Sequence, residues 1–316
     1  MSVILITGGA GFIGSAFAER AMRDADNQVI IVDNLSTGHL ERLPQMNSNN
    51  WRFIKCDVND FGDISSVIHS FHFDYIFHYA AVVGVQRTQE NPVSVLRDIR
   101  GIENILNLSK NSSVKRIFFS SSSEVYGEPV DLPQNEETTP LNSRVPYAVV
   151  KNVGEAFLKS YKKEYNLNYT IFRFFNTYGP KQSKDFVMLR FISLALQNRD
   201  IYIYGDGSQT RTFCYIDDNI EATYNNFLSA MSGKNNTNEV INIGSDIETS
   251  VIELAQKIIS ISGSKSKIIH VPPLPEGDMK RRLPDISKMK ELLNREPINL
   301  DEGIKKILEK PLFMSL

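Results

Sequence analysis

The stretch Val3-Ile4-Leu5-Ile6-Thr7-Gly8-Gly9-Ala10-Gly11-Phe12-Ile13-Gly14 decides the fold of this chain. Its four leading apolar residues predict a buried strand, and the apolar periodicity that begins near Phe12 predicts a helix to about Met22. The glycines between strand and helix permit a sharp turn and let a ligand come close to the backbone. Because the N-terminus of a helix offers N–H groups and a positive dipole end, this turn predicts a site for a pyrophosphate.

An acidic residue stands at the distance that such a site requires. Residues 29–32 predict a second buried strand, and Asp33 follows it, 19 residues after Gly14. A carboxylate there binds the ribose 2′-hydroxyl of NAD. A Gly-x-Gly-x-x-Gly motif alone is weak evidence, but strand, turn, helix and acid together predict a dinucleotide site. No arginine follows Asp33 directly to neutralise a 2′-phosphate, so we expect NAD rather than NADP.

Composition excludes several classes of protein. The chain has 316 residues and a formal charge of −2, which gives no indication of nucleic acid or an anionic membrane as partner. No apolar run approaches the roughly 18 residues of a transmembrane helix, and the first residues lack the pattern of a signal peptide. Cys56 and Cys214 are the two cysteines, too few for a disulfide framework. We expect a cytoplasmic protein.

The first half of the sequence alternates predicted strands with predicted helices. This alternation predicts a doubly wound parallel sheet of the Rossmann type, an α/β fold, with ligands beyond the carboxyl ends of the strands. After residue 175 the pattern changes to short strands and proline-rich turns, which we interpret as a smaller mixed α/β substrate domain at 176–316. Segments near 212–245 are expected to return to the first domain. The further predicted strands are residues 51–56, 75–79, 116–119 and 169–175, and the clearest helices are 92–109 and 147–165.

Tyr147 and Lys151 are spaced i, i+4 and therefore share one face of the helix predicted at 147–165. A phenol titrates near 10, and a neighbouring ammonium group favours the phenolate that a base requires. Residues 120–123 are four serines that follow the strand at 116–119. One or two of these hydroxyls are predicted to bind the substrate oxygen that Tyr147 deprotonates, and most of the four serines are expected to be turn residues.

Several motifs, in this order, resemble those of the extended short-chain dehydrogenase/reductases that modify nucleotide sugars. The resemblance extends from Val3 to about Leu308. Besides the glycine loop, the motifs are Asp33-Asn34-Leu35-Ser36-Thr37-Gly38, Cys56-Asp57-Val58, His78-Tyr79-Ala80-Ala81, Ser122-Ser123-Glu124-Val125-Tyr126-Gly127, Tyr147-Ala148-Val149-Val150-Lys151, Arg173-Phe174-Phe175-Asn176-Thr177-Tyr178-Gly179-Pro180, Tyr204-Gly205-Asp206-Gly207-Ser208-Gln209-Thr210-Arg211 and Gly277-Asp278-Met279-Lys280-Arg281.

The resemblance implies a role for each matching residue. The catalytic residues would be Ser122, Tyr147 and Lys151, with Glu124 beside them. The nucleotide sugar would be bound by Asn176, Arg211 and Arg281, since arginine can grip phosphate oxygens through paired hydrogen bonds. NAD would be bound by Gly8, Gly11, Phe12, Ile13, Gly14, Asp33, Asn34, Ser36, Thr37, Gly38, Asp57, Val58, Ala80, Ala81, Tyr147 and Lys151. No metal is expected.

The sequence departs from the family pattern at two positions. Tyr79 stands where relatives often have leucine, and Val150 replaces a serine that can contact the cofactor in relatives. The resemblance also implies a homodimer that pairs through helices 92–109 and 147–165 in a four-helix bundle. Apolar residues that could face either the core or a partner are Val95, Ile99, Ile102, Val153 and Phe157.

The shared chemistry is oxidation at sugar C4, with the hydroxyl proton going to Tyr147 and the hydride to NAD, which is then recycled. Return of the hydride to the opposite face gives a 4-epimer, which we favour. Loss of a C5 carboxylate, as in UDP-glucuronate decarboxylases, is the alternative, and Ser123-Glu124 resembles those enzymes. A 4,6-dehydratase is less favoured because Ser123 replaces the usual aspartate. Simple 4-oxidation is the remaining outcome. The nucleotide, whether UDP, GDP or dTDP, stays open.

Two other classes of function are weaker. A metal hydrolase built on His69, His72 and His78 is disfavoured because no carboxylate motif accompanies them. A non-catalytic NAD-sensing regulator would share the fold, but it would need neither Tyr147 nor Lys151, and a turnover assay separates the two classes.

Overall fold

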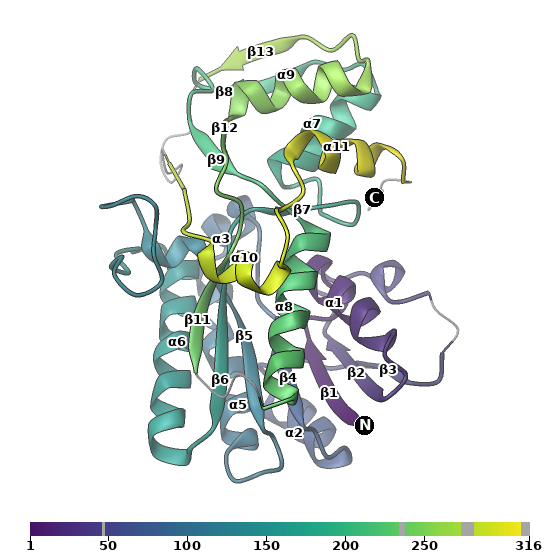
Figure 1. Ribbon diagram of the computed structural model, residues 1–316, viewed down its shortest axis with the longest axis vertical. Coiled ribbons are helices and arrows are strands. Elements are labelled where there is room, and N and C mark those ends of the chain that lie inside the picture. The colour runs from purple at the N-terminus through teal and green to yellow at the C-terminus, as the bar shows by residue number, and fades with distance from the viewer. Residues whose placement is uncertain (46–47, 234–237, 273–280, 311–316) are drawn as a thin grey trace. The chain divides into compact units, whose positions relative to one another are not determined.

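The computed structural model in Figure 1 describes residues 1–45, 48–233, 238–272 and 281–310. The chain divides into two compact units. Unit 1 comprises Met1–Val125, Ser143–Arg173 and Thr223–Ile241, and unit 2 comprises Tyr126–Asn142, Phe174–Ala222 and Asn242–Leu316. Residues 212–222, expected to return to the first domain, belong to unit 2, because Cys214–Tyr215 pairs with Thr177–Tyr178 and not with the large sheet.

A seven-stranded sheet forms the centre of unit 1, in the order β11-β6-β5-β4-β1-β2-β3. Strand β1 pairs in parallel with both β2 and β4, so the strand order reverses beside β1, where α/β sheets bind their ligands. The predicted Rossmann-type sheet is confirmed. The strands are β1 (Ser2–Thr7), β2 (Asn27–Asp33), β3 (Trp51–Lys55), β4 (Tyr75–His78), β5 (Arg116–Ser122), β6 (Asn168–Phe174) and β11 (Glu239–Ile243).

Helices cover both faces of this sheet, which is why its central strands are continuously apolar (Figure 1). On one face, α2, α5 and α6 pack their apolar side chains against Leu5, Ile76 and Ile117. On the other, Phe77 and Phe118 stack at 4.3 Å between ring centroids. The helices and short 3-10 turns are α1 (Phe12–Met22), η1 (Leu40–Arg42), α2 (Phe61–Ser70), α3 (Val85–Glu90), α4 (Pro92–Leu96), α5 (Asp98–Ser109), η2 (Ser123–Tyr126), α6 (Pro146–Tyr165) and α8 (Ile216–Met231).

Local sequence explains where α6 begins and ends. Pro146 occupies its first turn, where a missing N–H costs nothing, and Asn166 ends it in the left-handed conformation with φ 56°. The structure differs from the prediction of one helix at 92–109, because this segment is divided at Arg97 into α4 and α5. The N–H of Arg97 donates to the carbonyls of Ser94 and Val95, so the chain tightens there without leaving the helical region.

Unit 2 consists of short strand pairs and helices. The pairs are β7 with β10, β9 with β12 and β8 with β13, and α9 packs against α7 and α11. Ser250 and Glu253 form a capping box at the start of α9, which fixes the turn after β12. The elements are β7 (Thr177–Tyr178), α7 (Val187–Leu196), β8 (Ile201–Tyr204), β9 (Thr210–Thr212), β10 (Cys214–Tyr215), β12 (Glu248–Ser250), α9 (Val251–Ser262), β13 (Ile268–Val271), α10 (Ser287–Leu293) and α11 (Leu300–Leu308).

Within the part of the chain that the structure describes, no helix combines the length and apolar character needed to cross a bilayer.

Candidate functional site

The glycine loop after β1 has no room for side chains. A Cβ added to Gly14 would lie 2.4 Å from the carbonyl oxygen of Gly8, and one added to Gly11 would lie 2.9 Å from the same atom. Gly8 has φ +66°, and a Cβ there would lie 2.6 Å from the nitrogen of Ala80. The loop is therefore bare backbone folded tightly on itself, as close approach to a pyrophosphate requires.

The N-terminus of α1 is suited to an anion. Gly11 is its N-cap in an extended conformation, and among the described residues no side chain caps the helix there. Its first turn, which contains Phe12 and Ile13, carries no acidic residue. The positive end of the helix is thus available to a phosphate group.

Asp33, at the end of β2, is joined to the glycine loop. Its carboxylate accepts hydrogen bonds from the N–H of Ala10 at 3.0 Å and from the N–H of Leu35 at 2.8 Å. Gly38 packs directly on this carboxylate, since a Cβ at Gly38 would lie 2.6 Å from Asp33 Oδ1. Burial raises the pKa of Asp33, and the two backbone N–H groups oppose that rise. Each carboxylate oxygen can accept a second hydrogen bond, which leaves capacity for a ribose hydroxyl.

The loops after β2 and β3 are connected by side chains. Asn34 donates from Nδ2 to Asp57 at 3.2 Å and accepts from the N–H of Ser36 at 2.9 Å. The carbonyl of Thr37 accepts from Arg42, and the carbonyl of Val58 accepts from Asn104 of α5. These bonds hold the predicted adenosine-binding segments at the same edge of the sheet.

Thr7, which sequence reasoning missed, fixes the start of the loop after β4. Its hydroxyl lies 2.9 Å from His78 Nδ1 and accepts from the N–H of Ala80 at 3.2 Å. His78 is fully buried, and its pKa is lowered to about 3 by burial and by the charge of Lys151. The imidazole is therefore neutral and serves to hold Ala80, next to Ala81, against Gly8.

Asp98 is a second residue that sequence reasoning missed. It begins α5, is only 8 % exposed, and accepts from the N–H of Val82 at 2.7 Å and from Asn59 at 3.3 Å. Burial raises its pKa, while the N–H of Val82 and the charge of Lys151 oppose the rise. Asp98 thus ties the loops after β3 and β4 to α5 and places a carboxyl group in the electrostatic environment of Lys151.

Tyr147 and Lys151 lie on α6, as the spacing predicts. Lys151 Nζ is 5.8 Å from the centroid of the Tyr147 ring and donates to the carbonyl of Ser120 at 2.6 Å. Lys151 is buried, and burial lowers its pKa to about 8, against the opposing charge of Asp98. The ammonium group is therefore held beside the phenol and is close to its titration point at neutral pH.

Three of the four serines at 120–123 are strand residues, although we expected most of the four to lie in a turn. Ser120, Ser121 and Ser122 are buried at the end of β5, because α6 supplies polar partners for the first two. Ser121 Oγ donates to Glu155 at 2.6 Å, and Glu155 forms a buried pair with Arg173, with Arg173 Nε and Nη2 at 2.9 and 2.7 Å from its oxygens. Lys151 and Glu155 therefore fix α6 against consecutive residues of β5.

Ser122 ends β5, and its hydroxyl oxygen has a backbone partner. Its Oγ accepts a hydrogen bond from the N–H of Glu124 at 3.2 Å. A hydroxyl that accepts in this way retains its own hydrogen for a substrate oxygen. Glu124 lies half-buried in the short η2 turn that follows.

The side chain of Tyr79, which stands where relatives often have leucine, packs in the core of unit 1. Its ring packs edge-on against Phe17 of α1 and Phe77, each 5.9 Å away between centroids. Burial raises the pKa of its phenol, and a hydrogen bond with Thr223 opposes the rise. The tyrosine thus belongs to the aromatic layer between the sheet, α1 and α8.

The three residues predicted to bind the nucleotide sugar lie in unit 2. Asn176 donates to the carbonyl of Thr212 at 3.1 Å, and Arg211, 9 % exposed, donates to the carbonyl of Thr210 at 2.7 Å. Arg281 forms an ion pair with Glu248. The preceding residues of that motif, 277–280, lie outside the described residues. The roles of all three stay predictions.

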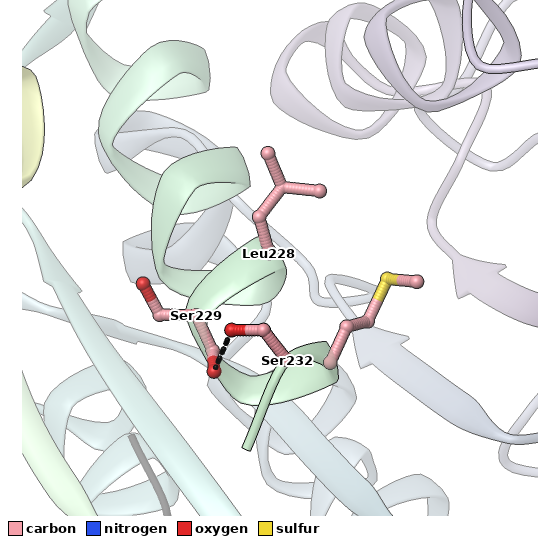
Figure 2. A pocket seen from close by; sticks show the side chains of 4 residues that line it. Leu228, Ser229 and Ser232 are labelled. Atoms are coloured by element: carbon pink, nitrogen blue, oxygen red, sulfur yellow. Dashed lines mark hydrogen bonds between the residues drawn. The ribbon is translucent and has the colours of Figure 1, made fainter. Parts of the chain in front are cut away.

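The hollow in Figure 2 is separate from these residues. It has a volume of about 490 Å³ and lies at the C-terminal end of α8, lined by Leu228, Ser229, Met231 and Ser232. Ser232 Oγ donates to the carbonyl of Ser229 at 3.1 Å, as the dashed line shows. Since no predicted site residue lines it, this hollow is not the candidate site.

Comparisons with known proteins agree with the geometry of unit 1. The model of the GDP-mannose 4,6-dehydratase family matches residues 5–307. The chain is 37% identical to the UDP-N-acetyl-α-D-glucosaminuronate decarboxylase of Bacillus cytotoxicus, with 96% of each protein covered. It is 36% identical to a putative UDP-glucose 4-epimerase of Methanocaldococcus jannaschii, with 97% of each covered. The UDP-glucose 4-epimerase of Thermus thermophilus, solved in complex with NAD, superposes with a TM-score of 0.88 at 26% identity, covering 99% of this chain and all of that one.

The bare glycine loop, the uncapped end of α1 and Asp33 fit NAD, and the Tyr147–Lys151 pair lies beside β5 in the same unit. The chain therefore belongs to the GDP-mannose 4,6-dehydratase family of NAD-dependent nucleotide-sugar enzymes.

Proposed function

We propose that this protein is an NAD-dependent UDP-sugar 4-epimerase. The observation that carries the proposal is the contact of α6 with β5, in which Lys151 donates to Ser120 and lies beside the Tyr147 ring. That arrangement is an acid–base group with a cation beside it, at the end of the strand that carries Ser122. UDP is proposed as the nucleotide because the relatives named above are UDP-sugar enzymes.

The side chains of unit 1 perform the proton transfer. Ser122 donates a hydrogen bond to the oxygen on sugar C4, and Tyr147 accepts the proton of that hydroxyl. The buried ammonium of Lys151 stabilises the phenolate that results. NAD, held by the glycine loop and Asp33, would supply the hydride acceptor and donor for C4. Tyr147 then gives its proton back to the C4 oxygen, and the 4-epimer would result where the hydride returns to the opposite face of C4.

Residues of unit 2 are proposed to bind the nucleotide diphosphate and thereby position the sugar. Arg211 and Arg281 would contact phosphate oxygens through guanidinium N–H groups, and Asn176 would add a neutral hydrogen bond.

Decarboxylation is the second candidate, and one feature favours it. Glu124 follows Ser123 in the η2 turn, directly after Ser122, and this Ser-Glu pair resembles that of UDP-glucuronate decarboxylases. With a carboxylate at C5, oxidation at C4 creates a β-keto acid that can lose carbon dioxide. The resemblance to the Bacillus cytotoxicus decarboxylase supports this alternative.

Product analysis separates the two candidates. The protein is incubated with NAD and, separately, with UDP-glucose, UDP-N-acetylglucosamine and UDP-glucuronate, and the mass and stereochemistry of each product are determined. We expect a product that has the mass of the substrate and the opposite configuration at sugar C4. Release of carbon dioxide from UDP-glucuronate would establish the second candidate, and loss of water would identify a dehydratase.

A homodimer is also proposed. Apolar side chains on α4 and at the start of α6 are exposed, among them Val93, Leu96 and Val149. Val95 and Ile102, predicted as core or partner residues, are core, and Ile99 and Phe157 pack partly against it. A second copy would cover the exposed apolar residues in a four-helix arrangement. Sedimentation at micromolar concentration should give a dimer mass.

A reducing cytoplasm is proposed as the location, because Cys56 and Cys214 are both buried free thiols and form no disulfide with each other.

A further inference from the structure

The ion pair between Arg281 and Glu248 engages one edge of the guanidinium. Arg281 Nε lies 3.0 Å from Glu248 Oε1, and Arg281 Nη2 lies 2.5 Å from Oε2. A guanidinium has five N–H donors in a planar fork, and this bidentate contact uses two of them. The Arg281 side chain is 53 % exposed, so its outer edge can still meet a ligand.

Glu248 is itself anchored. It lies in β12, which pairs antiparallel with β9, and its Oε1 accepts a hydrogen bond from Thr210 Oγ1 at 2.7 Å. Thr210 directly precedes Arg211 in β9, and its carbonyl accepts from Arg211 Nη1. The neighbouring Arg281 charge and the Thr210 hydroxyl lower the pKa of Glu248, so it is ionised at neutral pH. One carboxylate therefore connects Arg281 to the strand that carries Arg211.

A contact of this kind does little for the stability of the fold, because exposed ion pairs are screened by water. It does restrict the conformations of a flexible arginine side chain. A free arginine side chain loses rotamer entropy when it binds phosphate, and a carboxylate that already holds one edge removes part of that loss before binding.

We propose that Glu248 is a positioning residue that holds Arg281 in the orientation in which its outer edge binds the substrate diphosphate. The proposal rests on the proposed function, in which Arg281 contacts those phosphates. Glu248 acts through Arg281, so its effect must depend on both the arginine and the phosphate groups.

The test is calorimetric titration of the NAD-saturated protein with UDP and with uridine. Glu248→Ala should weaken UDP binding about three- to tenfold and leave uridine binding unchanged, the range expected when one long side chain is no longer pre-ordered. The glutamine of Glu248→Gln can still accept the hydrogen bond from Thr210, so this variant should lose less UDP affinity than Glu248→Ala. The double variant Glu248→Ala/Arg281→Ala should bind UDP no more weakly than Arg281→Ala alone.

The control variant is Asp301→Ala, which breaks the exposed Lys257–Asp301 pair of the same unit and should bind UDP as the wild type does. Thermal unfolding verifies that each variant is folded. Tighter UDP binding by Glu248→Ala would overturn the proposal, because Glu248 would then compete with phosphate. Unchanged binding by Glu248→Ala with weakened binding by Arg281→Ala would refute the positioning role alone. Unchanged binding by both would refute the diphosphate role of Arg281 itself.

Discussion

Gly14→Ala should selectively damage the cofactor site. The added methyl carbon would lie 2.4 Å from the carbonyl oxygen of Gly8 and 2.9 Å from Gly9 Cα. Ordinary contact begins at 3.4 Å, so the Gly8 carbonyl must move by 3.4 − 2.4, about 1 Å. Overpacking of this kind costs about 1–3 kcal/mol. Because the displaced atoms form the loop that receives the pyrophosphate, we expect NAD binding to weaken about 5- to 150-fold.

The assay is calorimetric titration with NAD, with thermal unfolding measured in its absence and presence. Gly62→Ala is the matched control, since Gly62 also lies in the first turn of a helix, where an added methyl would meet only Asp60 Oδ1, at 3.2 Å. The Asp60 side chain must move by only a few tenths of an ångström, and Gly62 lies outside the glycine loop, so the control should bind NAD as the wild type does. If Gly14→Ala bound NAD as tightly as Gly62→Ala, the assignment of the loop as a pyrophosphate cradle would be refuted.

Four further predictions concern the cofactor and the acid–base pair. Tyr147→Phe should lower turnover roughly 10²- to 10⁴-fold in a product assay while UDP binding stays unchanged, and full activity would remove the mechanism. Lys151 has a pKa of about 8 and loses its proton as pH rises through that value, so turnover should fall on the alkaline side. Asp98→Asn removes a charge that raises this pKa, so the alkaline limb of its pH–rate profile should move to lower pH, and an unmoved limb would contradict the coupling. Titration should show tighter binding of NAD than of NADP, and Asp33→Ser should reduce this difference in affinity. Equal affinities in the wild type would contradict the role proposed for Asp33.

Local patterns in the sequence predicted the strand, turn and helix that carry the proposed cofactor residues. The α1 helix begins at Phe12 and ends at Met22, as its apolar period indicates, and Asp33 ends β2. Every one of these signals lies within a single strand–turn–helix–strand segment, where spacing along the chain determines position in space. The helix that carries Tyr147 and Lys151 begins one residue earlier than predicted, at Pro146.

The residues that were missed have partners far away in the sequence. Thr7 contacts Ala80 across 73 residues, Asp98 contacts Val82 across 16, and Ser121 contacts Glu155 across 34. A serine or aspartate without its partner resembles a turn residue, which is why most of the serines at 120–123 were expected in a turn. Tertiary hydrogen bonds override that local preference, and no spacing rule along one chain predicts them.

The central claim is that the substrate is oxidised at C4 by transfer of the C4 hydrogen as hydride and reduced again by its return. The most direct test uses a UDP-sugar that carries deuterium at C4, incubated with the protein and catalytic NAD in ordinary water, with the product examined by mass spectrometry and NMR. Retention of the deuterium at C4 of a product with inverted configuration is the predicted result. Loss of the deuterium to solvent, with product still formed, would contradict the claim.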